Sequence, residues 1–417
     1  MLINILSHKR ILITSLFFLF AMTYFLDNTS SKDISNEGEV SEVSAEDLEQ
    51  VSSLTELTVS FEQFSDFFET IANKKGGAYA FELMRVADLP FGLDMHLLGH
   101  VVGDILYSQE GIDGMSLCTH DFRNACSHTM VIGALIDFGT AAFEDIREAC
   151  YAAPGGKGAY TMCFHGLGHG VLAFNEYDMA KTIDMCDQLG TSEYNQREAV
   201  ECFGGAVMEI IGGGGHDRES WDSKRKEYLL PEDPLFLCRQ SYVTDKYSSM
   251  CYNYITPYMY EALEADMARP SDEVFDQVFD WCAEIPTEEI ANRQACYGGQ
   301  GKEFIGIATG RDFSGHSAPT VEALQQMYDW CSLANEEDGF EYCLFSTVDS
   351  LYWGGENDFS GPVQFCKLVD NVEVKERCFD SLDNNVLYYI DDRLYFQKYC
   401  VALPTEFQAS CKTKLGI

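Results

Sequence analysis

Two pairs of histidines recur at a spacing that could do metal chemistry. His96 and His100 are four residues apart, and so are His165 and His169. Residues four apart lie on one face of a helix, one turn from each other. Two imidazoles at this spacing can bind the same metal ion, as they do in helical zinc motifs.

A fifth histidine joins this set through the register of the cysteines. His128 lies two residues after Cys126, and His165 lies two residues after Cys163. His96 has the equivalent place in a preceding segment that lacks a cysteine pair. Equivalent positions on packed neighbouring helices are about 8–10 Å apart, a gap that inward-pointing side chains can close. We therefore expect the five histidines to line one stripe of adjacent helices.

An imidazole-rich site suits zinc, copper, iron or a noncovalently bound haem. Asp104 and Glu209 are candidate carboxylate ligands, because Asp104 shares a helix face with His100 and Glu209 follows the repeat register. Zinc or iron held with an open coordination position could activate water. The sequence contains no HExxH, P-loop, dinucleotide-binding or nucleophile-elbow motif, so it does not decide whether the protein is an enzyme.

Two other interpretations of the histidines stay open. They could form a substrate-binding or acid–base cleft without metal, or be structural residues copied with each repeat. Glycines interrupt the same segments, at Gly99, Gly103, Gly133, Gly166, Gly168, Gly170, Gly204 and Gly205. A glycine inside a helix costs about 0.5–1 kcal/mol relative to alanine. Its repeated use indicates either close helix packing or a cleft where a ligand touches the backbone.

The 16 cysteines form a second pattern, which predicts disulfides. No CxxC occurs, so zinc-ribbon, thioredoxin-like and covalent haem motifs are missing. An even number of cysteines in sequential pairs is typical of an exported, oxidised protein. We expect each pair to bond within one helical hairpin, and bonds between neighbouring hairpins are the alternative. The pairs are Cys118 with Cys126, Cys150 with Cys163, Cys186 with Cys202, Cys238 with Cys251, Cys282 with Cys296, Cys331 with Cys343, Cys366 with Cys378 and Cys400 with Cys411.

The residues around these pairs predict helical hairpins. An apolar segment ends at Trp281 and Cys282, a turn with Pro286 follows, and Cys296 lies early in a new helical segment. The second cysteines recur every 33–49 residues, the range of helical repeats. One hairpin cannot bury its own apolar face, so neighbours must stack. We expect an all-α fold, an α-solenoid of about eight to nine helical-hairpin repeats, each stapled by a disulfide.

This layout resembles the disulfide-stapled members of the Sel1 and tetratricopeptide class of α-helical solenoids. The resemblance is one of architecture, covers about residues 90–417, and rests on the paired cysteines between helical segments. It implies a curved stack of helices. It implies no functional residue, because the repeat consensus of those families is absent.

The N-terminus indicates export. Lys9 and Arg10 precede an apolar run from Ile11 to Leu26, typical of a signal anchor or a cleaved signal peptide. As an anchor, it would give a single-pass membrane protein with a cytoplasmic N-terminus and a periplasmic or extracellular body. The predicted order is an n-region at 1–10, the anchor at 11–26, an acidic flexible spacer at 27–57, an N-terminal helical cap at 58–90, His-rich helical repeats at 91–215 and Cys-paired helical repeats at 216–417.

The charge limits the partners. The chain has 67 acidic and 28 basic residues and a net charge of −39, which argues against nucleic acid because phosphate binding needs a basic surface. The membrane is an expected partner through the N-terminal anchor only.

A non-catalytic scaffold in the periplasm or cell envelope is the second functional hypothesis. Helical solenoids bind proteins or peptides on their concave face, and aromatic residues are common anchors there. The alternative is that these aromatic residues fill the core between repeats. The candidates are Tyr352, Trp353, Tyr388, Tyr389, Tyr395 and Phe396.

Overall fold

The structure is a computed structural model that describes residues 43–417 apart from 58, 91–92, 120, 154–155, 214–217, 310–318, 335 and 355–356. The described residues belong to one compact unit. Their regular structure is helical, with no strand and one isolated bridge between Leu230 and Asp233. The all-α prediction is confirmed. The predicted n-region and anchor, at 1–10 and 11–26, lie outside the described residues.

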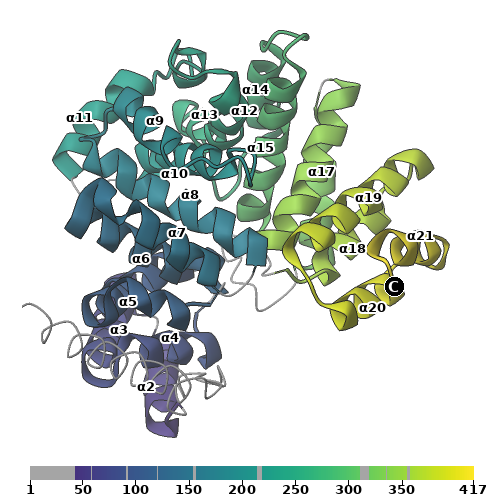
Figure 1. Ribbon diagram of the computed structural model, residues 1–417. Coiled ribbons are helices and arrows are strands. Elements are labelled where there is room, and N and C mark those ends of the chain that lie inside the picture. Colours follow the sequence, from purple (N-terminus) through teal and green to yellow (C-terminus); the bar gives the residue numbers. More distant parts are fainter. Residues whose placement is uncertain are drawn as a thin grey trace, which may run out of the picture. The chain divides into compact units, whose positions relative to one another are not determined.

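The five candidate histidines lie in helices of the first half of the described chain. Figure 1 shows these helices in purple to teal. These are α2 (Ala45–Glu56), α3 (Phe61–Lys75), α4 (Gly77–Val86), α5 (Met95–Glu110), η1 (Gly111–Leu117), α6 (Asp121–Phe138), η2 (Gly139–Ala142), α7 (Phe143–Ala152), α8 (Gly156–Phe174), α9 (Met179–Asp187) and α10 (Arg197–Gly212).

The helices of the second half follow. These are α11 (Arg218–Tyr228), η3 (Leu237–Arg239), α12 (Asp245–Tyr254), α13 (Thr256–Ala262), α14 (Asp272–Ala283), α15 (Ile290–Ala308), α16 (Val321–Cys331), α17 (Glu337–Gly354), α18 (Ser360–Leu368), α19 (Val372–Tyr389), α20 (Arg393–Ala402) and α21 (Thr405–Leu415).

All eight disulfides form as predicted, each within its own hairpin, and no free cysteine occurs in the described residues. The alternative pairing between neighbouring hairpins is therefore wrong. The bonds join Cys118 to Cys126, Cys150 to Cys163, Cys186 to Cys202, Cys238 to Cys251, Cys282 to Cys296, Cys331 to Cys343, Cys366 to Cys378 and Cys400 to Cys411.

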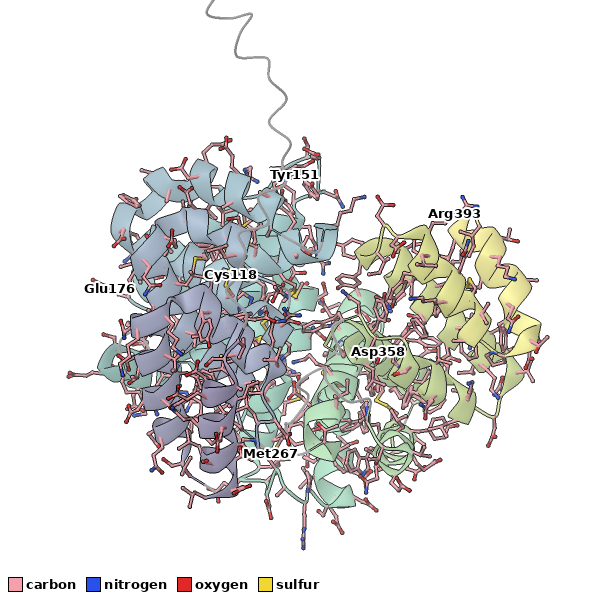
Figure 2. All side chains as sticks on the ribbon, turned by 90° about the horizontal axis from the view of Figure 1, so that it is seen from below. Cys118, Tyr151, Glu176, Met267, Asp358 and Arg393 are labelled. Carbon is pink, nitrogen blue, oxygen red and sulfur yellow. A yellow bond between two sulfur atoms is a disulfide. The ribbon has the colours of Figure 1, made fainter. Side chains whose placement is uncertain are left out.

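The bonded cysteines lie in the core. Cys118 is 2% exposed, whereas Tyr151 projects from the surface at 72% exposure (Figure 2). Each bond joins the end of one segment to a helix that follows it in the chain, and so limits how far that helix can rotate.

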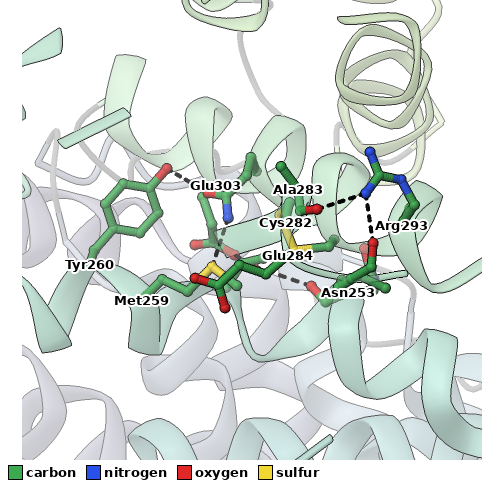
Figure 3. The surroundings of a disulfide bond; sticks show 12 residues. Asn253, Met259, Tyr260, Cys282, Ala283, Glu284, Arg293 and Glu303 are labelled. Carbon is green, nitrogen blue, oxygen red and sulfur yellow. Dashed lines mark hydrogen bonds between the residues drawn. A yellow bond between two sulfur atoms is a disulfide. The ribbon is translucent and has the colours of Figure 1, made fainter. Parts of the chain in front are cut away.

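A buried arginine completes one of these junctions. Cys282, near the end of α14, bonds Cys296 in α15. Between them Arg293 donates through Nη1 to the carbonyl oxygens of Ala283 at 3.0 Å and Ile285 at 2.7 Å (Figure 3). The last carbonyls of a helix have no partner within it, so Arg293 satisfies groups that burial would otherwise leave unpaired.

Six helices that carry second cysteines follow one another through direct contacts. α8 contacts α10, α10 contacts α12, α12 contacts α15, α15 contacts α17, and α17 contacts α19. Figure 1 shows this series running from teal through green to yellow. α19 also contacts α8, so the series closes on itself. The predicted solenoid is not confirmed, because a simple helical stack keeps its first and sixth helices apart.

The predicted flexible spacer at 27–57 is wrong for its last part, where α2 forms. Ser44 caps this helix by accepting from the Asp47 backbone N–H at 3.3 Å, and Val51 is completely buried. The Asp47 carboxylate is buried and accepts hydrogen bonds from Lys75, at 2.5 Å, and Tyr79. These contacts with α3 and α4 order a segment whose acidic composition suggested disorder.

One described stretch meets the length and hydropathy criteria for a membrane span. Asp121–Ala152 has a window of mean hydropathy 1.3, and 56% of that window is buried inside the protein. Core helices of soluble proteins meet the same criteria, and the first part of this stretch, α6, packs between α5 and α8.

Candidate metal centre

Three adjacent helices bring all five histidines into one cluster. His96 and His100 come from α5, His128 from α6, and His165 and His169 from α8. Figure 1 shows these helices in sequence order, and α6 contacts both of the others. The His128 ring is central: its centroid lies 5.4 and 5.6 Å from those of His96 and His100, and 6.2 Å from those of His165 and His169. The predicted stripe therefore exists as contacts between rings.

The tightest group is the triad of His96, His100 and His128. Each offers a ring nitrogen, and these three atoms lie within 4.8 Å of one another. The Nε2 atoms of His96 and His100 are 3.1 Å apart. His96 Nδ1 lies 2.7 Å from the carbonyl oxygen of Phe122. A carbonyl only accepts, so Nδ1 carries the proton and the lone pair of Nε2 points toward His100.

The start of α6 is built unusually to supply that carbonyl. Phe122, Arg123 and Asn124 all have left-handed backbone angles, with φ of 54°, 54° and 62°. Such angles cost about 1–3 kcal/mol for each residue that is not glycine, and they concentrate at functional sites. Here they place the Phe122 carbonyl against His96 and start the helical turn that carries His128.

His128 is buried without a polar partner. It is 2% exposed, and neither ring nitrogen has a hydrogen bond among the described residues. A buried polar group left unpaired costs about 1–3 kcal/mol, so native structures rarely keep one without a reason. The unpaired nitrogens of His128 are explained if His128, His96 and His100 direct lone pairs toward a shared ion.

The second pair of histidines is held by α10. His169 Nδ1 lies 3.1 Å from a carboxylate oxygen of Glu209, which fixes the ring in the way carboxylates orient metal-binding histidines. His165 Nε2 lies 3.2 Å from the sulfur of Met208. Its Nδ1 lies 3.6 Å from the Glu201 carboxylate, which is longer than a hydrogen bond.

The two candidate carboxylates fall in different places. Glu209 is buried and contacts His169, so it orients a ring of the cluster. Asp104 is exposed on α5 and is not part of the triad group.

Two residues beside His165 were not predicted from the sequence. Glu201 faces its Nδ1 atom, and the Tyr254 ring centroid is 5.0 Å from that of His165. The one sequence signal for Glu201 is its position directly before a second cysteine.

The glycines serve close packing between these helices. A Cβ on Gly168 of α8 would lie 1.9 Å from the Cys202 carbonyl oxygen, and one on Gly205 of α10 would lie 1.9 Å from that of His165. A Cβ on Gly166 would lie 2.2 Å from the His128 ring. Of the two sequence interpretations, close helix packing is the one these distances favour.

Gly168→Ala is expected to destabilise the protein by about 1–3 kcal/mol, since the new methyl group must push α8 and α10 apart. Gly212→Ala is the matched control, because Gly212 lies in α10 and a Cβ there would have no neighbouring atom within 4 Å. It should be neutral or stabilising by about 0.5–1 kcal/mol. Urea unfolding measures both, and equal losses would contradict the packing role.

Burial keeps the central imidazoles neutral. It lowers the pKa of His96 and His128 well below 6.5, and the neighbouring imidazoles lower it further. Burial also lowers the pKa of His165, although Glu201 opposes this shift. Neutral imidazole is the form that binds metal, so His96 and His128 can bind an ion at neutral pH without first losing a proton.

The same shifts predict acid destabilisation of the metal-free protein. The unfolded chain takes up these protons near pH 6.5, and the folded chain takes them up only at lower pH. Stability is therefore complete above pH 6.5 and falls below it, by up to about 1.4 kcal/mol per pH unit for each histidine. Urea unfolding at pH 7.5 and 5.5 in EDTA measures the effect. If His128→Leu lost as much stability between these two pH values as the parent, the pH effect would belong to groups other than His128.

Comparison with known proteins gives no family for this chain: no family model matches it, and neither a curated protein nor a solved structure matches it significantly.

Proposed function

We propose that this protein binds a transition-metal ion through His96, His100 and His128, in a body outside the cytoplasm. The observation that carries the proposal is the convergence of three ring nitrogens within 4.8 Å around a buried His128 that lacks a polar partner among the described residues. The eight disulfides support the compartment, because such bonds persist only where the surroundings are oxidising.

Zinc and copper are the metals that this donor set favours. Imidazole suits both, and non-haem iron sites usually combine two histidines with a carboxylate. No carboxylate belongs to the triad group found among the described residues. The Met208 sulfur beside His165 adds a soft donor at the edge of the cluster, which copper accepts. Three protein ligands leave a coordination position for water or substrate, the arrangement of catalytic zinc sites.

Haem is not part of the proposal. His96 and His100 lie on one helix with ring centroids 4.7 Å apart, so they cannot approach opposite faces of one porphyrin. The other rings are within 6.2 Å of His128, and this leaves no room for a macrocycle among them.

A non-catalytic scaffold for protein–protein interaction has less support. Tyr352 is fully buried and its hydroxyl lies 2.9 Å from that of Tyr395, while Phe396 is 9% exposed. These three residues fill the core, as the alternative interpretation expected. A protein or peptide partner stays a prediction that no observation here favours.

Titration of the metal-free, full-length protein with Zn²⁺ and Cu²⁺ tests the proposal. One ion per chain is expected, with affinity at least about 100-fold weaker in His100→Ala, because removing a ligand costs more than removing a residue that supports one. Leu97→Ala is the control: Leu97 is 48% exposed on the same helix and should not change affinity. Binding that His100→Ala leaves unchanged would reject the triad as the site.

A further inference from the structure

A cavity of about 640 Å³ lies among the six helices of the closed series, and each of them contributes lining residues. Its volume is within the usual range for small-molecule sites. None of the five histidines lines it. Glu201 does, and this carboxylate also faces His165, so the cavity and the histidine cluster share one wall.

In the described part of the chain the lining is aromatic and polar apart from two methionines. No leucine, isoleucine, valine or phenylalanine contributes to it among the described residues. A lipid or alkyl ligand would need those residues, so the cavity suits a ligand with both flat apolar faces and polar edges. The aromatic side chains are Tyr194, Tyr254, Trp353, Tyr388 and Tyr389.

Contacts made inside the protein hold the polar groups in place. Asp349 accepts from Ser381 Oγ at 2.8 Å and from Asn385 Nδ2 at 2.5 Å, and both bonds end on Oδ1. Both partners are used by Oδ1, so among the described residues Oδ2 keeps its capacity to accept from a ligand. Glu201 is paired with Arg197 at 2.5 Å. Rigid, pre-oriented acceptors of this kind favour binding because little ordering is needed when the ligand arrives.

The basic residues of the lining do not select an anion. Arg197 is compensated by Glu201 at 2.5 Å, and Lys302 by Glu303 at 2.6 Å. Lys157, the third basic residue of the lining, is exposed to solvent. A phosphate or sulfate site would need unpaired positive charge held inside the cavity, so this arrangement favours a polar ligand without strong charge.

We propose that this cavity binds a carbohydrate. A sugar ring presents C–H faces that pack on tyrosine and tryptophan rings, and its hydroxyl groups both donate and accept hydrogen bonds around the edge. Trp353 and Tyr388 provide the flat surfaces, and Asp349, Asn385 and Glu201 provide acceptors and donors beside them. The proposal does not rest on metal binding, because the triad lies outside the cavity lining.

The test uses the full-length protein on an array of neutral oligosaccharides together with a peptide library. Calorimetric titration with the strongest oligosaccharide follows. Trp353→Ala and Tyr388→Ala should each weaken binding at least about tenfold. Tyr388 is 41% exposed, so its replacement does not threaten the fold if Trp353→Ala fails to fold. Phe138→Ala is the aromatic control, since Phe138 is 67% exposed and lies outside the lining.

Binding that persists after EDTA treatment separates this proposal from the metal site. Two results would overturn the carbohydrate proposal. The first is that no oligosaccharide binds, whether or not a peptide does. The second is that Tyr388→Ala binds the oligosaccharide as tightly as the parent protein.

Discussion

Replacement of His128 by leucine is expected to abolish metal binding at the triad and, at the same time, to stabilise the metal-free protein. His128 is 2% exposed, and both ring nitrogens lack hydrogen bonds among the described residues. Removing two buried unpaired groups recovers about 1–3 kcal/mol, less any packing cost from the change of shape. A residue kept only for structure would show the opposite result, with stability lost on substitution.

The comparison needs a substitution that changes shape without changing polarity. Met130→Leu provides it, because Met130 is completely buried on the same helix and this swap conserves volume. It should leave metal binding intact and change stability by less than about 1.5 kcal/mol. Urea unfolding in EDTA gives the stability and calorimetric titration gives the binding. A clear loss of metal-free stability in His128→Leu, with Met130→Leu neutral, would contradict the functional interpretation of this histidine.

The disulfide between Cys186 and Cys202 is expected to be required for both the fold and the cluster. Its cysteines are 16 residues apart, and a loop of this size gives a stabilisation of about 3 kcal/mol. Cys202 lies in α10, and its carbonyl is the atom that Gly168 of α8 approaches. Cys186→Ala/Cys202→Ala should therefore lose about 3 kcal/mol and weaken metal binding, because α8 carries His165 and His169.

The last disulfide is the matched control. Cys400 and Cys411 are 11 residues apart, and their helices, α20 and α21, contribute nothing to the histidine cluster. Their replacement by alanine should cost a similar stability, about 3 kcal/mol, and leave the metal affinity unchanged. Thermal unfolding and metal titration of both variants measure this difference. Equal effects on metal affinity would show that the first disulfide acts only through overall stability.

Most of what the sequence could predict came from the regular spacing of the cysteines and histidines along the chain. Cysteines 8 to 16 residues apart favour a bond across one short turn, and the structure decides for this pairing over the one between neighbouring hairpins. The positions of His128 and His165 relative to their cysteines predicted the shared stripe. Both patterns depend on contacts within one hairpin or between helices that follow closely in the chain.

Contacts between distant segments were not predictable in this way. The closure of α19 on α8 depends on Tyr389 packing against Gly158, where a Cβ would lie 2.0 Å from the tyrosine ring. No spacing rule relates residues so far apart. The helix α2 was not predicted because the acidic composition of its segment indicated a flexible spacer. The capping residue of the helix and its buried Val51 carried too little weight in that prediction. Glu201 was missed because its role depends on which helix packs beside α8.

The most direct test of the metal site is the metal content of the protein itself. Full-length protein produced in an oxidising compartment is analysed by mass spectrometry for bound metals, beside a His96→Ala/His100→Ala variant whose fold is checked by circular dichroism. We predict about one zinc or copper ion per parent chain and a large loss in the folded variant. A parent that holds no metal, even after incubation with both ions, would contradict the account and assign the five histidines to another role.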